Sequence, residues 1–132
     1  MTSRPPVPNP TNPTRFGDLE AAEDFVAIGK DVNMQDAEKR TPLHYAAAHD
    51  HAHVLSFLLR EGANLELADA KNNTPLHYAA GYGRVDIAEI LLEAGASVCA
   101  TNGTGKTPAA LAKLSESNPI LSIPEIMSRL EA

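Results

Sequence analysis

A repeat with a period of about 33 residues constrains the fold of this chain more than any other feature. The segment Thr74–Ala80 reads TPLHYAA, and the same seven letters stand one period earlier at Thr41–Ala47. A weaker third copy, TPAALAK, begins one period later at Thr107. Other markers keep the same step, namely Gly29, Gly62 and Gly95, and the pairs Phe25-Val26, Leu58-Leu59 and Leu91-Leu92. A fixed period of this length indicates stacked structural units rather than one globular topology.

The T-P-L-H-x-A pattern at this period resembles the ankyrin repeat. The resemblance implies an all-α solenoid of helix-turn-helix units that are joined by short hairpin fingers. We expect two full repeats, at 36–68 and 69–101, between an N-terminal half repeat at 16–35 and a divergent C-terminal capping repeat at 102–132. Five prolines predict a disordered or extended tail over 1–15, because proline lacks an amide donor and disfavours helix in the residue before it.

The first unit is expected to be only half a repeat. Apolar residues in the segment 18–28 recur at helical spacing, and in register this segment is the second helix of a unit. The prolines take the place of its first helix. Part of an apolar face then lacks its usual cover, which would come from the tail, from a partner, or from an N-terminal region of a longer gene product.

Local signals place the later helices. Thr41 and Thr74 suit helix caps, because a threonine hydroxyl can accept an orphan backbone N–H and the following proline lacks one. The ankyrin resemblance assigns structural roles to His44 and His77, which would bond the threonine hydroxyl and the backbone of the neighbouring unit. In the last unit, Ser122 with Glu125 three residues on predicts a capping box.

Composition narrows the class of protein. The formal net charge is −6 with no basic stripe, which argues against a nucleic-acid partner. The single cysteine, Cys99, cannot form an internal disulfide, and this fits a reducing compartment. No apolar run approaches the roughly 20 residues that span a bilayer, and the N-terminus lacks the apolar segment of a secretory signal. We therefore expect a cytoplasmic or nuclear protein without a membrane span.

Two motifs resemble ligand sites, one for phosphate and one for zinc, but neither meets the requirements of such a site. Gly103–Thr107 resembles the end of a phosphate-binding loop, but Ala100 stands where the pattern needs glycine. The histidine-dense tract His49–His53 lacks partners at zinc-ligand spacing, and Asp50 within it occupies a turn that favours positive φ. No nucleophile, base and acid form a recognisable signature. The sequence therefore predicts no catalytic residue, no metal site and no cofactor.

The surface carries the functional prediction. Ankyrin proteins bind through their finger tips and through exposed positions of the inner helices, which together form a concave face. In this sequence the matching positions are Ala37, Glu38, Arg40, Ala48, His49, Ala70, Lys71, Asn73, Gly81, Tyr82, Gly103, Thr104, Lys106, Leu114 and Ser115. Among and beside them, the predicted partner-binding residues are Arg40, His49, Lys71, Asn73, Tyr82 and Arg84.

Tyr82 beside Arg84 has the composition of a binding hot spot, since tyrosine and arginine are enriched there. The flanking Gly81 and Gly83 lower helix propensity without an obvious packing gain, which also favours a functional role for the segment. The leading hypothesis is a non-catalytic adaptor that binds a protein partner of unknown identity.

A closer resemblance raises an alternative. The segment from Lys71 through Arg84 is similar to the ankyrin domain of the plant cytosolic targeting factors that escort chloroplast outer-envelope proteins. That family's Gly-Tyr-Gly-Arg segment contacts lipid headgroups, which implies that Tyr82 and Arg84 would recognise lipid phosphate. The resemblance gives the alternative hypothesis, a targeting factor that contacts organelle lipid headgroups. This chain departs from the family in one respect, because the family's long acidic client-binding region is absent from it.

Overall fold

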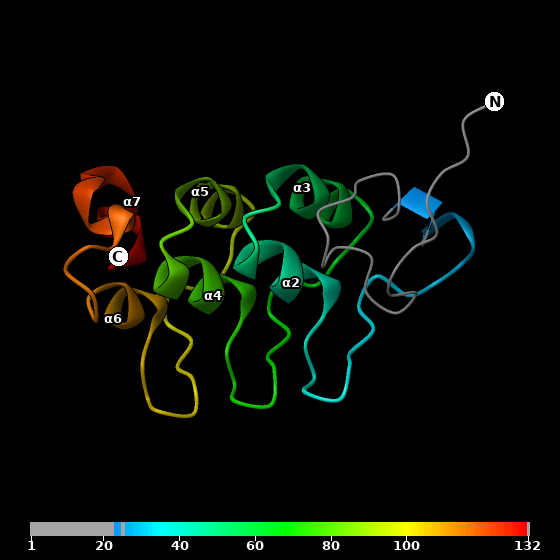
Figure 1. Cartoon of the computed structure of the whole chain (residues 1–132), viewed down its shortest axis with the longest axis horizontal. Helices are drawn as coiled ribbons and strands as arrows, with labels where there is room; N and C mark the ends of the chain where they lie inside the picture. The colour runs from blue at the N-terminus through cyan, green and yellow to red at the C-terminus, as the bar shows by residue number, and fades with distance from the viewer. Residues whose placement is uncertain (1–22, 25, 132) are drawn as a thin grey trace.

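Two rows of short helices form a solenoid in the computed structural model, which describes residues 23–24 and 26–131 (Figure 1). The inner row holds α2 (Pro42–Ala48), α4 (Pro75–Tyr82) and α6 (Pro108–Ala112). The outer row holds α3 (Ala52–Arg60), α5 (Val85–Glu93) and α7 (Pro124–Leu130), with the 3₁₀ turn η2 (Pro119–Ser122) before α7. Looped fingers project from the inner row.

The predicted all-α solenoid is confirmed, and no strand occurs in the described part of the chain. The predicted tail over 1–15 lies outside the described residues, as does most of the predicted helix over 18–28. None of the helices that the structure describes is long and apolar enough to cross a bilayer.

Each inner helix begins at a capping threonine that is followed by proline. The hydroxyls of Thr41 and Thr74 accept the N–H of His44 and His77, each at 3.4 Å. In return, Nδ1 of each histidine accepts the threonine N–H, at 3.0 and 3.1 Å. This reciprocal cap satisfies two orphan amides at each helix start. Thr107 makes only the first of these bonds, because the third unit lacks the histidine.

The same two histidines join consecutive units. Nε2 of His44 donates to the Asn73 carbonyl at 2.7 Å, and Nε2 of His77 donates to the Lys106 carbonyl at 2.9 Å. Because Nδ1 accepts and Nε2 donates, both rings are neutral. Burial lowers the pKa of both histidines below the ordinary value, which favours this neutral form.

Small residues on the inner helices let neighbouring units approach closely. α4 packs against both other inner helices, and the alanines at the contacts are fully buried, namely Ala46, Ala47, Ala79, Ala80 and Ala112. The outer helices add leucine, isoleucine and valine to one continuous core. Its completely buried large side chains are Leu43, Val54, Leu55, Leu58, Leu76, Ile87, Leu91 and Ile120. Each unit therefore buries apolar surface against its neighbours, as repeat arrays require.

The predicted capping box at Ser122 is wrong. Ser122 is the last residue of η2, and α7 begins after Ile123 with no side-chain cap. Asn118 explains the difference, because its Oδ1 accepts the N–H of the residue two positions on (2.9 Å) and so starts the 3₁₀ turn that takes up Ser122. Buried Asn118 also donates through Nδ2 to the Ala80 carbonyl at 2.7 Å, which ties the last unit to α4.

Candidate binding face on the inner helices

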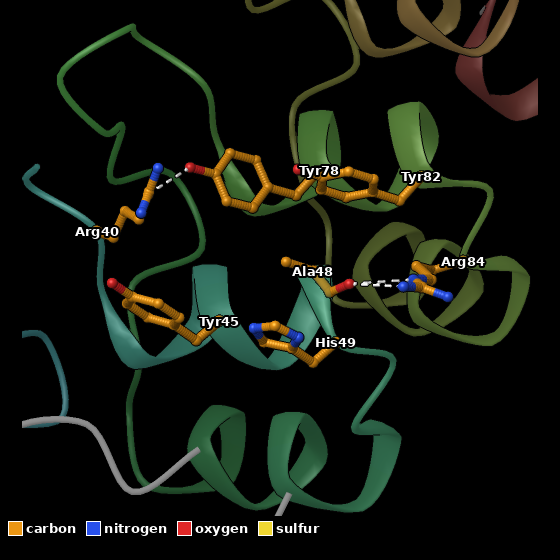
Figure 2. Close-up of a pocket in the computed structure, with 7 residues that line it drawn as sticks. All are labelled: Arg40, Tyr45, Ala48, His49, Tyr78, Tyr82 and Arg84. Carbon is orange, nitrogen blue, oxygen red and sulfur yellow. Dashed lines mark hydrogen bonds between the residues drawn. The ribbon is translucent and has the colours of Figure 1, made fainter. Parts of the chain in front are cut away.

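A cleft of about 330 Å³ lies between α2 and α4 on the inner-helix face (Figure 2). We call it the cationic cleft, and its lining consists of Arg40, Tyr45, Ala48, His49, Tyr78, Tyr82 and Arg84. It brings together four of the predicted partner-binding residues, Arg40, His49, Tyr82 and Arg84. Figure 2 shows the two helices as opposite walls, with one arginine at each end.

Aromatic pairs four residues apart form the two walls. Tyr45 stacks on His49 along α2, with ring centroids 6.4 Å apart. Tyr78 meets Tyr82 edge to face along α4, at 6.2 Å. Residues at this spacing lie on the same helix face. Tyr45 and Tyr78 were not among the predicted site residues, although both precede one by four positions and are 33 residues apart, at equivalent places of the repeat.

Two finger aspartates hold the tyrosine walls in place. The hydroxyl of Tyr45 donates to Asp36, and that of Tyr78 donates to Asp69. The other oxygen of Asp69 accepts two backbone N–H groups of its finger, each at 2.9 Å. Burial alone would raise the pKa of Asp69, but these hydrogen bonds outweigh it and lower the pKa. The carboxylates therefore stay charged and fix each finger to the helix that follows it.

Arg40 is a permanently charged group at one end of the cationic cleft. Its Nε donates to the Tyr78 hydroxyl at 3.1 Å, and its guanidinium carbon lies 5.9 Å from the ring centroid of Tyr45. Interactions with the Tyr45 and Tyr78 side chains raise the pKa of Arg40 above its usual value. Arg40 thus contacts both walls of the cleft.

Arg84, at the other end, makes a structural hydrogen bond that the sequence does not predict. Its Nε and Nη2 donate to the Ala48 carbonyl at the end of α2, at 3.1 and 2.9 Å. A cation is favourable at a helix C-terminus, where carbonyl groups lack partners. Its guanidinium carbon also lies 6.0 Å from the ring centroid of Tyr82. Arg84 therefore links two repeats as well as lining the cleft.

Gly83 has a packing role, which corrects the expectation that it has none. It ends α4 in the left-handed conformation, with φ of 71°. A Cβ at this position would lie 2.6 Å from Pro119 Cδ and 3.0 Å from Asn118 Oδ1. Only glycine allows both this backbone turn and the close approach of the last unit. For Gly81 the expectation stands, because a Cβ there would meet only Leu111, at 3.8 Å.

A second cleft of about 410 Å³ adjoins the first, between α4 and α6, and we call it the apolar cleft. None of the residues that line it is an arginine, lysine, aspartate or glutamate; they are Asn73, His77, Tyr78, Gly81, Tyr82, Asn102, Thr104, Leu111, Leu114 and Ser115. Tyr82 and Leu114 are 62% and 68% exposed. Tyr78 and Tyr82 line both clefts and so separate them.

The two remaining predicted site residues lie elsewhere. Asn73 lines the apolar cleft, where its Oδ1 accepts from Asn102 Nδ2 at 2.9 Å. Lys71 is exposed on a finger and lines neither cleft. Within the described residues, no group of three or more histidine, cysteine, aspartate or glutamate side chains is arranged to hold a metal ion.

A family model for ankyrin repeats, in three copies, matches residues 14–102. Myotrophin of Xenopus tropicalis is 50% identical over 48 residues, which cover 36% of this chain and 41% of that protein. Ankyrin repeat domain-containing protein 7 of Homo sapiens is 48% identical over 46 residues, covering 34% and 18%. The 60 kDa lysophospholipase of Mus musculus is 44% identical over 46 residues, covering 35% and 8%. The similarity thus spans less than half the length of each relative.

Proposed function

This chain belongs to the ankyrin-repeat family, and from that membership we propose that it is a protein-binding module whose partner docks on the inner-helix face. Ankyrin repeats indicate protein–protein interaction as the general role. The proposal adds the location: the cationic cleft, the apolar cleft and the tyrosine pair between them.

The observation that carries the proposal is the exposure of Tyr82 and Leu114 beside two adjoining clefts. Exposed apolar side chains that gather in one place, as these two do around the apolar cleft, mark interaction sites, whereas single ones do not. Tyrosine and arginine are also the residues that most often dominate binding energy. Both are present in the cationic cleft, where Asp36 and Asp69 hold the tyrosine walls rigid before any partner arrives. Preorganised side chains lose less entropy on binding.

We propose no catalytic role. His44 and His77 are the fully buried histidines among the described residues, and each uses both ring nitrogens in structural hydrogen bonds. The lysophospholipase is an enzyme by name, but the similarity covers only 8% of that protein. The repeat boundaries at 36–68, 69–101 and 102–132 and a cytoplasmic or nuclear location also remain proposals.

The lipid-binding alternative has weaker support than a protein partner. It assigns phosphate recognition to Arg84, but two nitrogens of that guanidinium already donate to the Ala48 carbonyl. The exposed groups beside it, Tyr82 and Leu114, are better suited to apolar contact with a protein. We therefore propose the protein partner and treat lipid binding as an outcome of the tests.

The proposal is tested by quantitative affinity purification with the full chain and the double variant Tyr82→Ala/Leu114→Ala. The matched control is Ile28→Ala, because Ile28 is an apolar side chain of similar exposure (71%) outside both clefts. The expected result is a partner set that the double variant loses and the control retains. A partner set that the double variant retains in full would contradict a binding role for this face.

A further inference from the structure

We infer that the partner presents an extended acidic segment, which places a carboxylate in the cationic cleft and an apolar side chain in the apolar cleft. This inference rests on the proposed function, because it names the partner chemistry for the same face. It follows from the charge of one cleft, the uncharged lining of the other with its exposed leucine and tyrosine, and the usual spacing of packed helices.

The charge of the cationic cleft is opposite to that of the whole chain. The protein carries a formal net charge of −6, yet this cleft is lined by two arginines and no carboxylate. Among the described residues, neither Arg40 nor Arg84 forms an ion pair, whereas Lys113 pairs with Glu131 at 2.5 Å. The nearest acids of the fingers, Asp36 and Asp69, are already held by tyrosine hydroxyls and backbone amides. The cleft therefore offers positive charge that no carboxylate of the described chain pairs directly.

The geometry of Arg40 suits a carboxylate. The bond from its Nε to Tyr78 and the contact of its guanidinium with the Tyr45 ring restrict the side chain to one orientation. A planar, oriented guanidinium binds a carboxylate through two parallel hydrogen bonds. The aromatic walls would shield such a pair from part of the surrounding water, which strengthens it. Arg84 contributes its charge at the opposite end, although its Nε and Nη2 donate to the Ala48 carbonyl.

The apolar cleft accepts a different side chain. Leu111 and Leu114 come from α6 and its C-terminal end, and the Tyr82 ring borders the cleft on the α4 side. Gly81 leaves this hollow open, because it contributes no side chain where a Cβ would approach Leu111 at 3.8 Å. No residue of its lining carries a charge, because His77 is held neutral by burial and by its structural hydrogen bonds, so the cleft favours an aliphatic or aromatic side chain.

The distance between the two clefts sets how far apart the acidic and the apolar residue must lie in the partner's segment. Each cleft lies between successive inner helices, and packed helices are about 8–10 Å apart. An extended peptide advances about 3.3 Å per residue. A segment that crosses the inner helices would therefore place its acid and its apolar residue about three positions apart.

The test is selection from a library of random peptides on the purified full chain. Peptides of about twelve residues are long enough to cross both clefts when extended. The expected enrichment is aspartate or glutamate with an aliphatic or aromatic residue about three positions away. Affinities of an enriched peptide, and of its Asp→Asn or Glu→Gln form, are then measured against each variant.

The variants separate the two clefts. Arg40→Gln should weaken binding of the acidic peptide about ten- to a hundredfold, because the charge-assisted hydrogen bond to its carboxylate is lost. The same variant should barely affect the amide form of the peptide, which has no carboxylate to make that bond. Gly81→Leu should fill the apolar cleft and weaken peptides with the apolar residue about tenfold. The matched control is Arg60→Gln, which removes an exposed positive charge at the end of α3, outside both clefts, and should leave the affinity within about threefold. Circular dichroism checks that each variant is folded.

The outcomes distinguish this inference from the proposed function. Two results would overturn the inference but not the proposed function: enriched peptides that require Tyr82 but share no acidic residue, or acidic peptides that bind Arg40→Gln as tightly as the wild type. Peptides that bind Tyr82→Ala as well as the wild type would contradict the proposed function itself. Stronger binding to vesicles of anionic phospholipid than to any enriched peptide would assign the cationic cleft to lipid headgroups and also overturn the inference.

Discussion

The two full repeats share their helices and differ where the inner helix turns into the outer one. The first turn reads His49-Asp50-His51, and the equivalent turn of the second repeat reads Tyr82-Gly83-Arg84. The middle residue is left-handed in both, with φ of 61° at Asp50 and 71° at Gly83. The backbone is therefore the same, while the side chains differ at all three positions.

The second turn is the one against which other units pack. Gly83 lies against Pro119 of the last unit, and Arg84 reaches back to the Ala48 carbonyl of the first full repeat. His51, the counterpart of Arg84, instead stacks with His49, with ring centroids 5.8 Å apart. The comparison shows that this turn combines inter-repeat packing at Gly83 and Arg84 with an exposed side chain at Tyr82.

The largest expected effect comes from Gly83→Ala. The new Cβ would lie 2.6 Å from Pro119 in a left-handed residue, so strain and overcrowding should lower the free energy of unfolding by about 2–4 kcal/mol. Urea denaturation measures the loss. The matched control is Gly81→Ala, which should be neutral or stabilising by up to about 1 kcal/mol, because alanine is the better helix former. Equal effects of the two variants would refute the packing role of Gly83.

Arg84→Ala should lower the free energy of unfolding by about 1–2 kcal/mol, since the partly buried carbonyl of Ala48 loses both donors. Arg84→Lys should recover only part of this, because an ammonium cannot reproduce the planar contact. Denaturation in urea compares the three proteins. Stability equal to the wild type in both variants would show that the bond to Ala48 is incidental.

Asp50→Gly should raise the free energy of unfolding by about 1 kcal/mol, because glycine adopts the left-handed turn without a Cβ penalty. Thermal unfolding gives the readout. The result would make the two turns alike at their middle position. A lower melting temperature would indicate that the Asp50 side chain has a stabilising role that outweighs the backbone strain.

The smallest expected effect is that of pH, and it comes from the buried histidine that both repeats have, His44 in the first and His77 in the second. Burial lowers the pKa of His44 and His77 below 6.5, so the folded protein binds fewer protons than the unfolded chain. Stability should be complete above about pH 6.5 and should fall as the pH drops through that value. Urea denaturation between pH 8 and 5 tests this. His77→Asn should be less stable at pH 8 but should lose less on acidification. A midpoint that does not change with pH would contradict the account.

The sequence was sufficient to predict the architecture because every unit repeats the same local signals. The cap at Thr41 and Thr74 and the following proline recur at the period, and each depends on neighbours within a few residues. The contacts of Gly83 and Arg84 could not be predicted in this way. They join residues far apart in the chain, and the sequence itself shows no signal for such pairs.

The candidate site was predicted in part for the same reason. Arg40, His49 and Tyr82 occupy positions that the repeat pattern marks as exposed, and Arg84 follows two residues after Tyr82. The four side chains meet in one cleft. Tyr45 and Tyr78 were missed because they stand inside the TPLHYAA motif, which indicates architecture. In the structure they have both roles: their hydroxyls hold the fingers and their rings line the cleft.

The most direct test measures stability and binding on the same variants. Once a partner or enriched peptide is in hand, Tyr82→Ala and Gly83→Ala are each compared with the wild type in urea denaturation and in calorimetric titration at low temperature. The account predicts that Tyr82→Ala keeps its stability within about 0.5 kcal/mol, as an exposed site should, and loses binding by at least about tenfold. Gly83→Ala should lose stability and, while folded, keep most of its affinity. A Tyr82→Ala protein that binds like the wild type would contradict the central claim.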